Sequence, residues 1–557
     1  MSKLYRRDVL KWLLALGAAG FSGNAFASVA SFITPRINHC NYPGGVGFGV
    51  GICPKVPFGF IELPGTRMLG HANFGNYQYQ DGSVMVWVPA FYYRLAHASN
   101  PTYAVHGVNS VDIKPYSAFA DATAANAAGY ALHRAFYDAG AIKRGVMVDK
   151  YMCSSNAWGT GTIASSIKNG NPLSAHADHN PVEGLTACSV NQLYEFINAA
   201  HARDGADGAI NASSIFFPAS RFIYSALALL SLAHGQAASA TTNCAWYSAS
   251  TTNFTKGCNN NALADTNDTS VKWQSDGYSN CGKTGSAGYG GGDGNVFAKS
   301  AHNGQDCGIV DLNGLMWESS LGFSSIVTLV AIAGLSRANP CVVAWTGHGL
   351  TTGAFAQIGA ITQAGWTVLN DKIFSITRID DNSLSLDGVD TSALAADYVP
   401  ATDPGTIKNG TFYAAKTSIA MKSFTSGTAA ATDHWGATGI AAMMDAVPVV
   451  FETAYPNNGI AQRFGDGAGQ VLAEDVSGSD WLQTGLGFPS SAAGASPSGT
   501  NLFGADYYYQ YMVDACFLLS GGYWSNGAVA GVWTANWSYY RTYAYSFVGF
   551  RLACYPV

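Results

Sequence analysis

Alternating and periodic hydrophobic positions predict short strands around two helices in the N-terminal half of the chain. Residues 83–93 and 145–151 are rich in β-branched and aromatic residues, as strands are. Apolar residues recur at helical spacing over residues 190–202, and a second apolar run, 219–234, begins directly after Pro218. Two helices flanked by short strands indicate an α+β domain.

The segments around these elements lack a regular pattern. Residues 28–82 are rich in Gly, Pro and aromatic residues without helical periodicity, which predicts an irregular N-terminal extension. Residues 236–305 are heavy in Gly, Asn, Ser and Thr, which predicts an ordered loop excursion.

Residues 326–408 contain short strand-like runs separated by turn signals, which predicts a small β-barrel or sandwich. The residues Ala338–Cys341 and Thr346–Leu350 resemble a small β-domain that recurs as an insert in phage and bacterial surface proteins. We therefore expect an all-β domain inserted into a loop of the main fold. The alternative is that these strands extend the main fold itself. The runs are 327–330, 341–345, 356–358, 372–376 and 383–386.

Composition limits the classes of partner. The chain has 557 residues, which predicts two or three domains. Charged residues make up 11% of it, against about 25% in an average domain, and aromatic residues 13%. With a net charge of −6 and no Lys/Arg run beyond the N-terminus, we expect neither nucleic acid nor anionic lipid as a partner.

The first 27 residues have the layout of a cleavable export signal. Arg6-Arg7 precedes the apolar run 12–21, and the small-x-small site 25–27 follows it. The pair resembles the twin-arginine motif; the alternative is a general secretory signal with two chance arginines. We expect a mature protein that begins near Ser28 and resides in the periplasm, on the cell surface or outside the cell. Its eleven Cys are an odd number, and their pairing stays open.

Two local patterns suggest chemistry that their context does not support. Residues 277–284 match the phosphate-loop pattern, but the Gly-rich residues 285–292 cannot sustain the helix that such a loop must open. His176 and His179 flank Asp178, but no further ligand lies at a recognisable spacing. We expect these histidines to be solvated loop residues and predict no metal site.

Four groups of residues occur in the order found in the formylglycine-generating, sulfatase-modifying family, which the chain resembles over most of 83–551 apart from the insert. This resemblance implies the C-type-lectin-like fold of that subclass, formed by 83–325 and 409–557, with two helices, a twisted antiparallel sheet and long surface loops. The groups are 180–185, 216–221, 311–318, and finally Gly521-Gly522-Tyr523-Trp524 with Val548-Gly549-Phe550-Arg551.

The same resemblance argues against catalysis. The oxidase members carry a pair of copper-binding cysteines between the last two elements, whereas this chain has no Cys between Trp524 and Arg551. Cys516 and Cys554 lie outside that span, so no residue fills the nucleophile's role. We therefore predict no catalytic residue, no cofactor and no enzymatic activity.

Residues 521–551 resemble the variable region of proteins diversified by retroelements, which rewrite adenines in template codons, usually those of Asn. The resemblance implies a ligand-binding surface on a fixed scaffold, with the reverse transcriptase acting on the gene and not on the protein. Asn526 would be an unchanged template codon. The scaffold would be Trp524, Trp533, Trp537, Gly549, Phe550 and Arg551. The variable positions would be Tyr523, Ser525, Asn526, Val529, Thr534, Ser538, Tyr539, Tyr540, Tyr543, Tyr545, Ser546 and Phe547.

Tyr, Ser, Asn and Gly are also the residues that evolved binding loops use. The alternative is a set of aromatic strands packed in a core, but Ser538-Tyr539-Tyr540 and Tyr545-Ser546-Phe547 do not alternate as half-buried strands should. We expect an exposed surface whose ligand is a protein or glycan on another cell or surface. A phage receptor-binding tail adhesin of the same family is the alternative function, and the oxidase a third.

Overall fold

The chain is described from a computed structural model over residues 38–247, 256–258, 261–265, 268–278, 281–288, 296–403, 405–427, 435, 437–447, 458–463, 480–488, 491–493 and 506–556. The export signal expected at 1–27 lies outside the described residues, as do residues 28–37 of the expected extension.

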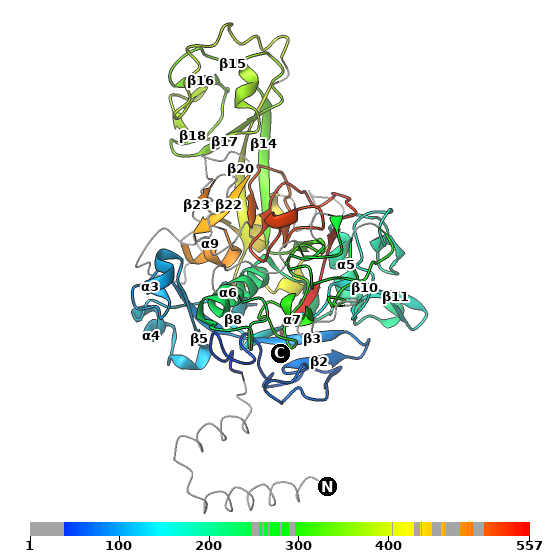
Figure 1. The fold of residues 1–557 in the computed structure, drawn as a ribbon. Helices are drawn as coiled ribbons and strands as arrows, with labels where there is room; N and C mark the ends of the chain where they lie inside the picture. Colours follow the sequence, from blue (N-terminus) through cyan, green and yellow to red (C-terminus); the bar gives the residue numbers. More distant parts are fainter. Residues whose placement is uncertain are drawn as a thin grey trace, which may run out of the picture.

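The fold is mixed α+β, with many short strands and few helices (Figure 1). Its main sheet has six strands, all antiparallel to their neighbours. The strands predicted near 83–89 and 145–151 are confirmed, and the C-terminal strand lies between two strands from the first half of the chain. In spatial order the strands are β1 (Phe60–Glu62), β2 (Asn76–Tyr79), β3 (Val84–Pro89), β9 (Gly145–Asp149), β28 (Leu552–Cys554) and β12 (Phe216–Pro218).

The expectation of an irregular extension over 28–82 is wrong for two of its segments. Strands β1 and β2 lie in it and pair with each other and with β3. The apolar side chains of Phe48, Val50 and Ile52 belong to the main hydrophobic core. Strands of three or four residues are too short to show the alternation by which a strand is recognised.

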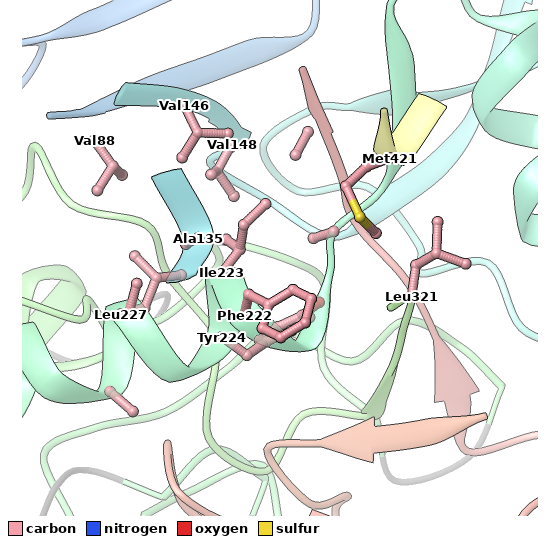
Figure 2. Close-up of a cluster of buried hydrophobic side chains, with 14 of the residues drawn as sticks. Val88, Ala135, Val146, Val148, Phe222, Ile223, Tyr224, Leu227, Leu321 and Met421 are labelled. Carbon is pink, nitrogen blue, oxygen red and sulfur yellow. The ribbon is translucent and has the colours of Figure 1, made fainter. Parts of the chain in front are cut away.

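Helix α6 (Arg221–Ala237) packs on this sheet. It begins two residues later than predicted, because Ser220 is its N-cap and accepts a hydrogen bond from the N–H of Ile223. Every residue from Arg221 to His234 is buried, as in a helix covered on all sides. Figure 2 shows Ile223 and Leu227 beneath Val88, Val146 and Val148 of β3 and β9, within the main core.

The second predicted helix is shorter than the apolar pattern over 190–202. Helix α5 covers Glu195–Ala202, because the preceding residues form turns whose backbone N–H groups bond elsewhere. Those of Leu193 and Tyr194, for example, donate to the carbonyls of Tyr543 and Arg541. The other described helices are α3 (Tyr103–His106), α4 (Ala122–Ala127), α7 (Val296–Lys299), α8 (Ala437–Met443) and α9 (Asp480–Leu486).

A second sheet carries the C-terminal segment. Its strand β27 runs parallel to β13 and pairs Val548 with Trp317 and Gly549 with Glu318, which joins two of the sequence motifs. In order, the strands are β23 (Ser491–Ala493), β22 (Asn458–Arg463), β24 (Tyr507–Tyr509), β26 (Ala535–Asn536), β25 (Leu518–Ser520), β13 (Trp317–Ser320) and β27 (Val548–Gly549).

Three small sheets complete this part of the fold. One is three-stranded, in the order β5 (Val111–Pro115), β4 (Phe91–Leu95), β6 (Ala131–Leu132), and two are hairpins. The hairpins are β7 (Tyr137–Asp138) with β8 (Ala141–Ile142), and β10 (Cys153–Trp158) with β11 (Gly161–Ser166).

The strands predicted over 326–408 are present and form a lobe with its own hydrophobic cluster. Figure 1 shows the lobe projecting at the top of the molecule, away from the N-terminal strands. Two long paired strands, β14 (Phe323–Ala331) and β20 (Thr406–Ala415), join it to the rest, and β21 (Met444–Val447) pairs with the inner half of β20. The strands between them are β15 (Gly334–Leu335), β16 (Cys341–Ala344), β17 (Phe355–Gly359), β18 (Ile373–Arg378) and β19 (Ser383–Leu386).

All eleven cysteines are among the described residues, and each is buried and outside any disulfide. Among the helices of the described ranges, none combines the length and the apolar character that a membrane crossing requires.

Candidate recognition surface

Buried aromatic side chains fix the base of the segment 521–551. Trp537 is 0% exposed and lies among four rings, with centroids 4.3 Å from Phe488, 5.3 Å from Phe323 and 5.5 Å from both Phe412 and Tyr508. Aromatic pairs at these separations add to the stabilisation that burial gives. The other expected scaffold residues, Trp524, Trp533, Gly549, Phe550 and Arg551, are buried as well.

Arg551 anchors the end of the segment to strand β13. Its Nε and Nη2 donate to Glu318 Oε2 and Oε1, each at 2.5 Å, in a bidentate pair. Further donor groups of the guanidinium reach the carbonyls of Asp149, Lys150 and Val310. Burial alone would lower the pKa of Arg551, but the Glu318 carboxylate raises it above its ordinary value. The Arg551 guanidinium thus stays charged, and its hydrogen bonds fix the segment's end.

Glycines at both ends of the segment allow close backbone approach. Gly521 has φ +91°, and a Cβ there would lie 2.5 Å from the carbonyl oxygen of Leu312. At Gly549 a Cβ would lie 2.7 Å from Met152 Cε and 2.8 Å from the carbonyl oxygen of Leu173. These contacts explain why both positions require glycine.

A continuous row of rings lies on this base. Tyr523 stacks on Phe547 with centroids 4.4 Å apart, and Phe547 lies 4.3 Å from Tyr545. Tyr545 stacks on Tyr543 at 4.5 Å, and Tyr543 meets Tyr540 edge-on at 4.8 Å. Tyr540 is 42% exposed, but the other rings are half-buried and pack against the main hydrophobic core, so the expected exposed surface is exposed only in part. Tyr539 joins the row through Tyr543, with ring centroids 4.9 Å apart. We call the row the aromatic ridge, defined as Tyr523, Tyr539, Tyr540, Tyr543, Tyr545 and Phe547.

The structure also describes the remaining predicted variable positions. Ser525 is exposed, and Asn526, Val529, Ser538 and Ser546 are half-buried. The amide oxygen of Asn526 accepts the N–H of Tyr523 at 2.9 Å, so this side chain supports the loop.

Thr534 is a correction, because its side chain is buried and not displayed. Its hydroxyl donates to the carbonyl of Val529 at 2.7 Å and accepts the N–H of Tyr507 at 3.2 Å. Both bonds stay inside the protein, so Thr534 belongs with the scaffold.

The ridge is electrically neutral. Burial, and after it the neighbouring Tyr545 and Tyr543, raises the pKa of the Tyr539 phenol. Burial and the hydrogen bond with Tyr545 do the same for Tyr543. The two charged side chains of 521–551, Arg541 and Arg551, are both buried. The surface therefore offers stacking faces and neutral hydroxyl groups.

Sequence reasoning missed several residues that hold this segment. Lys256 pairs with Asp506, whose Oδ2 also accepts the N–H of Trp533 at 3.1 Å, and both side chains are buried. Arg541 lies over the rings of Tyr194 at 5.1 Å and Trp435 at 5.4 Å. No motif marks these residues, since each partner is distant in sequence.

The expectation of solvated loop histidines is wrong for His179. Its ring is buried, and its Nε2 lies 2.5 Å from Asp276 Oδ2. His176 remains partly accessible and lies 3.5 Å from Asp178. Residues 285–288 form no helix, as expected after the phosphate-loop pattern, and residues 289–292 lie outside the described residues.

Cys516 and Cys554 are poorly suited to thiolate chemistry. Both are buried, and burial raises the pKa of each thiol. The Cys516 thiol donates to the carbonyl of Trp537 at 3.2 Å, so it faces the interior of the scaffold.

No family model matches the chain, and no curated protein matches it.

Proposed function

We propose that this chain is an exported ligand-binding protein with a C-type-lectin-like fold of the formylglycine-generating subclass, and that residues 521–551 form its recognition surface, diversified by a retroelement. One observation carries this proposal. The large aromatic residues expected to be invariant are buried, whereas the rings of the aromatic ridge beside them are half-buried or, at Tyr540, exposed. A diversified surface needs this separation, because sequence change at its positions must leave the core intact.

The junctions between the sequence motifs support the proposed fold. Glu318 of the third motif pairs with Arg551 of the last, and strand β12 of the second motif pairs with β28, directly after Arg551. Phe550 stacks on Phe196 of helix α5 with centroids 4.2 Å apart. Residues that are separate in sequence thus form one framework around the proposed surface.

The chemistry of the ridge favours a neutral ligand face. Tyrosine rings give large, rigid contact areas, and their hydroxyl groups can both donate and accept hydrogen bonds. Such a surface suits the apolar faces and hydroxyl groups of a glycan, or the neutral part of a protein surface. We propose that the ligand lies on another cell or surface, and we assign no catalytic residue and no cofactor.

Export and the inserted domain are part of the proposal. The N-terminal signal favours the periplasm, the cell surface or secretion over the phage tail adhesin, since virion proteins assemble in the cytoplasm. Exchange of Arg6-Arg7 for Lys-Lys should block export by the twin-arginine route, and unchanged export would contradict that route. The lobe over 326–408 is proposed as a separate β-domain.

The neighbouring DNA gives the sharpest test of diversification. A reverse transcriptase gene and a near-copy of the segment encoding 521–551, differing only at adenines of the copy, are expected. Codon changes among sibling clones should fall at ridge positions and spare Trp533 and Trp537. A locus without such a copy, or changes spread evenly over the chain, would contradict diversification.

Binding is tested with a glycan array and intact bacterial cells as probes. A triple variant, Tyr540→Ala with Tyr543→Ala and Tyr545→Ala, should lose the array or cell signal of the parent protein, because interface energy concentrates in a few aromatic anchors. Phe58→Ala is the matched control, since Phe58 is 97% exposed and lies outside the segment. Equal loss in the control, or full binding by the triple variant, would contradict this assignment.

A further inference from the structure

Three side chains of types that can bind a metal ion meet in the interior near Trp524. His179 comes from the loop after the second hairpin, and Asp276 and Cys281 come from the loop excursion about a hundred residues later. One ligand atom from each lies within 4.8 Å of the other two. The residues are 1%, 4% and 0% exposed, so the cluster is closed to solvent.

Asp276 is a buried carboxylate whose negative charge is compensated by few groups of the protein. In the part of the chain that the structure describes, His179 is the one residue paired with it as an ion pair. Its Oδ1 accepts the N–H of Tyr278 at 3.0 Å. A buried carboxylate normally has an arginine or lysine partner or coordinates a metal ion.

His179 supplies the second, independent observation. Its Nε2 lies 2.5 Å from Asp276 Oδ2, while its Nδ1 is buried and has no hydrogen-bond partner among the residues that the structure describes. When the ring proton is on Nδ1, the lone pair of Nε2 faces the Asp276 carboxylate, and a metal ion between the two groups takes both as ligands.

We propose that His179, Asp276 and Cys281 form a binding site for a divalent transition metal of the zinc type. Nitrogen, carboxylate oxygen and thiolate sulfur are the donors that zinc takes in proteins, and two ligands of one tetrahedral zinc lie roughly 3–4 Å apart. The three ligand atoms lie within 4.8 Å of one another, and His179 Nε2 and Asp276 Oδ2, which are 2.5 Å apart, must separate for the ion to enter between them. On binding, the metal replaces the thiol proton of Cys281, which leaves to the solvent.

The same three residue types also serve in thiol hydrolases, but the geometry here differs. That chemistry needs a hydrogen bond between the thiol and the histidine. The Cys281 thiol instead donates to the carbonyls of Gly282 at 3.4 Å and Leu315 at 3.6 Å. The cluster therefore holds a ligand more readily than it activates a nucleophile.

The site's position gives the metal a structural role. The His179 ring lies 5.7 Å from Trp524 and 4.9 Å from Tyr278. Trp524 in turn touches Tyr523 of the aromatic ridge at 5.4 Å. A bound ion would hold the loop excursion in place beside Trp524, which contacts the aromatic ridge, whichever ligand the ridge binds.

The test titrates Zn²⁺, and Co²⁺ as a spectroscopic probe, into full-length protein stripped with a chelator. One equivalent should bind with a raised thermal midpoint, and Co²⁺ should show a thiolate charge-transfer band. Cys281→Ser should remove that band, and Asp276→Asn, which keeps the side-chain shape, should weaken Zn²⁺ binding at least as much as the roughly 10- to 100-fold typical of losing an outer-shell partner.

Cys188→Ser is the control, because Cys188 is also buried but belongs to the main core. This variant should bind both ions as the parent protein does. No stoichiometric binding to the parent protein, or an unchanged cobalt band in Cys281→Ser, would overturn the proposal. The parent titration decides the question even where a variant fails to fold, and it is independent of any ligand of the ridge.

Discussion

Replacing ridge and scaffold aromatics separately distinguishes a displayed surface from a packed core. Trp537→Ala removes a side chain that is 0% exposed and in contact with four rings. Loss of a buried Trp costs about 3–5 kcal/mol of unfolding free energy. The close ring contacts put the expected value near the upper end of that range.

Tyr540→Ala should behave differently, because Tyr540 is 42% exposed. An exposed substitution costs about 0.5 kcal/mol, and loss of its edge-on contact with Tyr543 adds about 0.5–1.5 kcal/mol at most. Phe547 stacks between Tyr523 and Tyr545, so Phe547→Ala should fall between the two.

The assay is urea denaturation of each variant, followed by far-UV circular dichroism so that the lost Trp does not alter the signal. Ser525→Ala serves as the baseline, since Ser525 is exposed in the same segment. The loss of unfolding free energy should increase in the order Ser525→Ala, Tyr540→Ala, Phe547→Ala, Trp537→Ala. If Tyr540→Ala lowers the unfolding free energy as far as Trp537→Ala, the ridge is core and the recognition surface is refuted.

Three further predictions concern the framework. Deleting 326–408 should leave a protein that unfolds cooperatively, because the lobe has its own hydrophobic cluster and the cut ends lie on paired strands. Loss of the cooperative transition would show that the lobe belongs to the main core. Glu318→Gln should cost about 3–5 kcal/mol by leaving Arg551 buried without its charge partner, and adding Arg551→Met should recover part of that loss; a further loss in the double variant would contradict the pairing. Burial lowers the pKa of His302 to about 3, below the ordinary value near 6.5. Between these two pH values the unfolded chain binds a proton that the folded chain excludes, so the free energy of unfolding falls on acidification. Between pH 8 and pH 5 this amounts to about 2 kcal/mol, and His302→Gln should show a correspondingly smaller pH dependence in denaturant titrations; equal slopes would count against it.

The sequence predicted the elements whose patterns are long enough to be read. Helix α6 and strands β3 and β9 follow from periodicity, and so do the strands of the lobe. Strands β1 and β2 were missed, because three or four residues carry no usable period. Helix α5 was predicted too long, since an apolar pattern cannot show that its first residues bond to another segment.

Within the segment 521–551, residue type predicted the burial of the tryptophans, but of the twelve expected variable positions Ser525 and Tyr540 alone are exposed, and Thr534 is buried. Tryptophans are large and apolar, so burial is their lowest-energy environment, whereas tyrosines can keep a hydroxyl in water. A threonine is compatible with either environment. Thr534 is buried because Val529 and Tyr507 satisfy its hydroxyl, and the contact with Tyr507 depends on chain folding.

Most of the buried polar pairs could not be predicted from the sequence. Glu318 and Arg551 could be suspected because each ends a recognisable motif. Lys256 with Asp506, and His179 with Asp276, join positions that no spacing rule relates. A charged side chain is buried only where the fold supplies a partner for it. These pairs can therefore be identified only from a structure in which the loops are positioned. Both pairs lie beside scaffold tryptophans, Asp506 at Trp533 and His179 at Trp524. The loop excursion, in which the sequence predicted no regular elements, therefore supports the C-terminal segment 521–551.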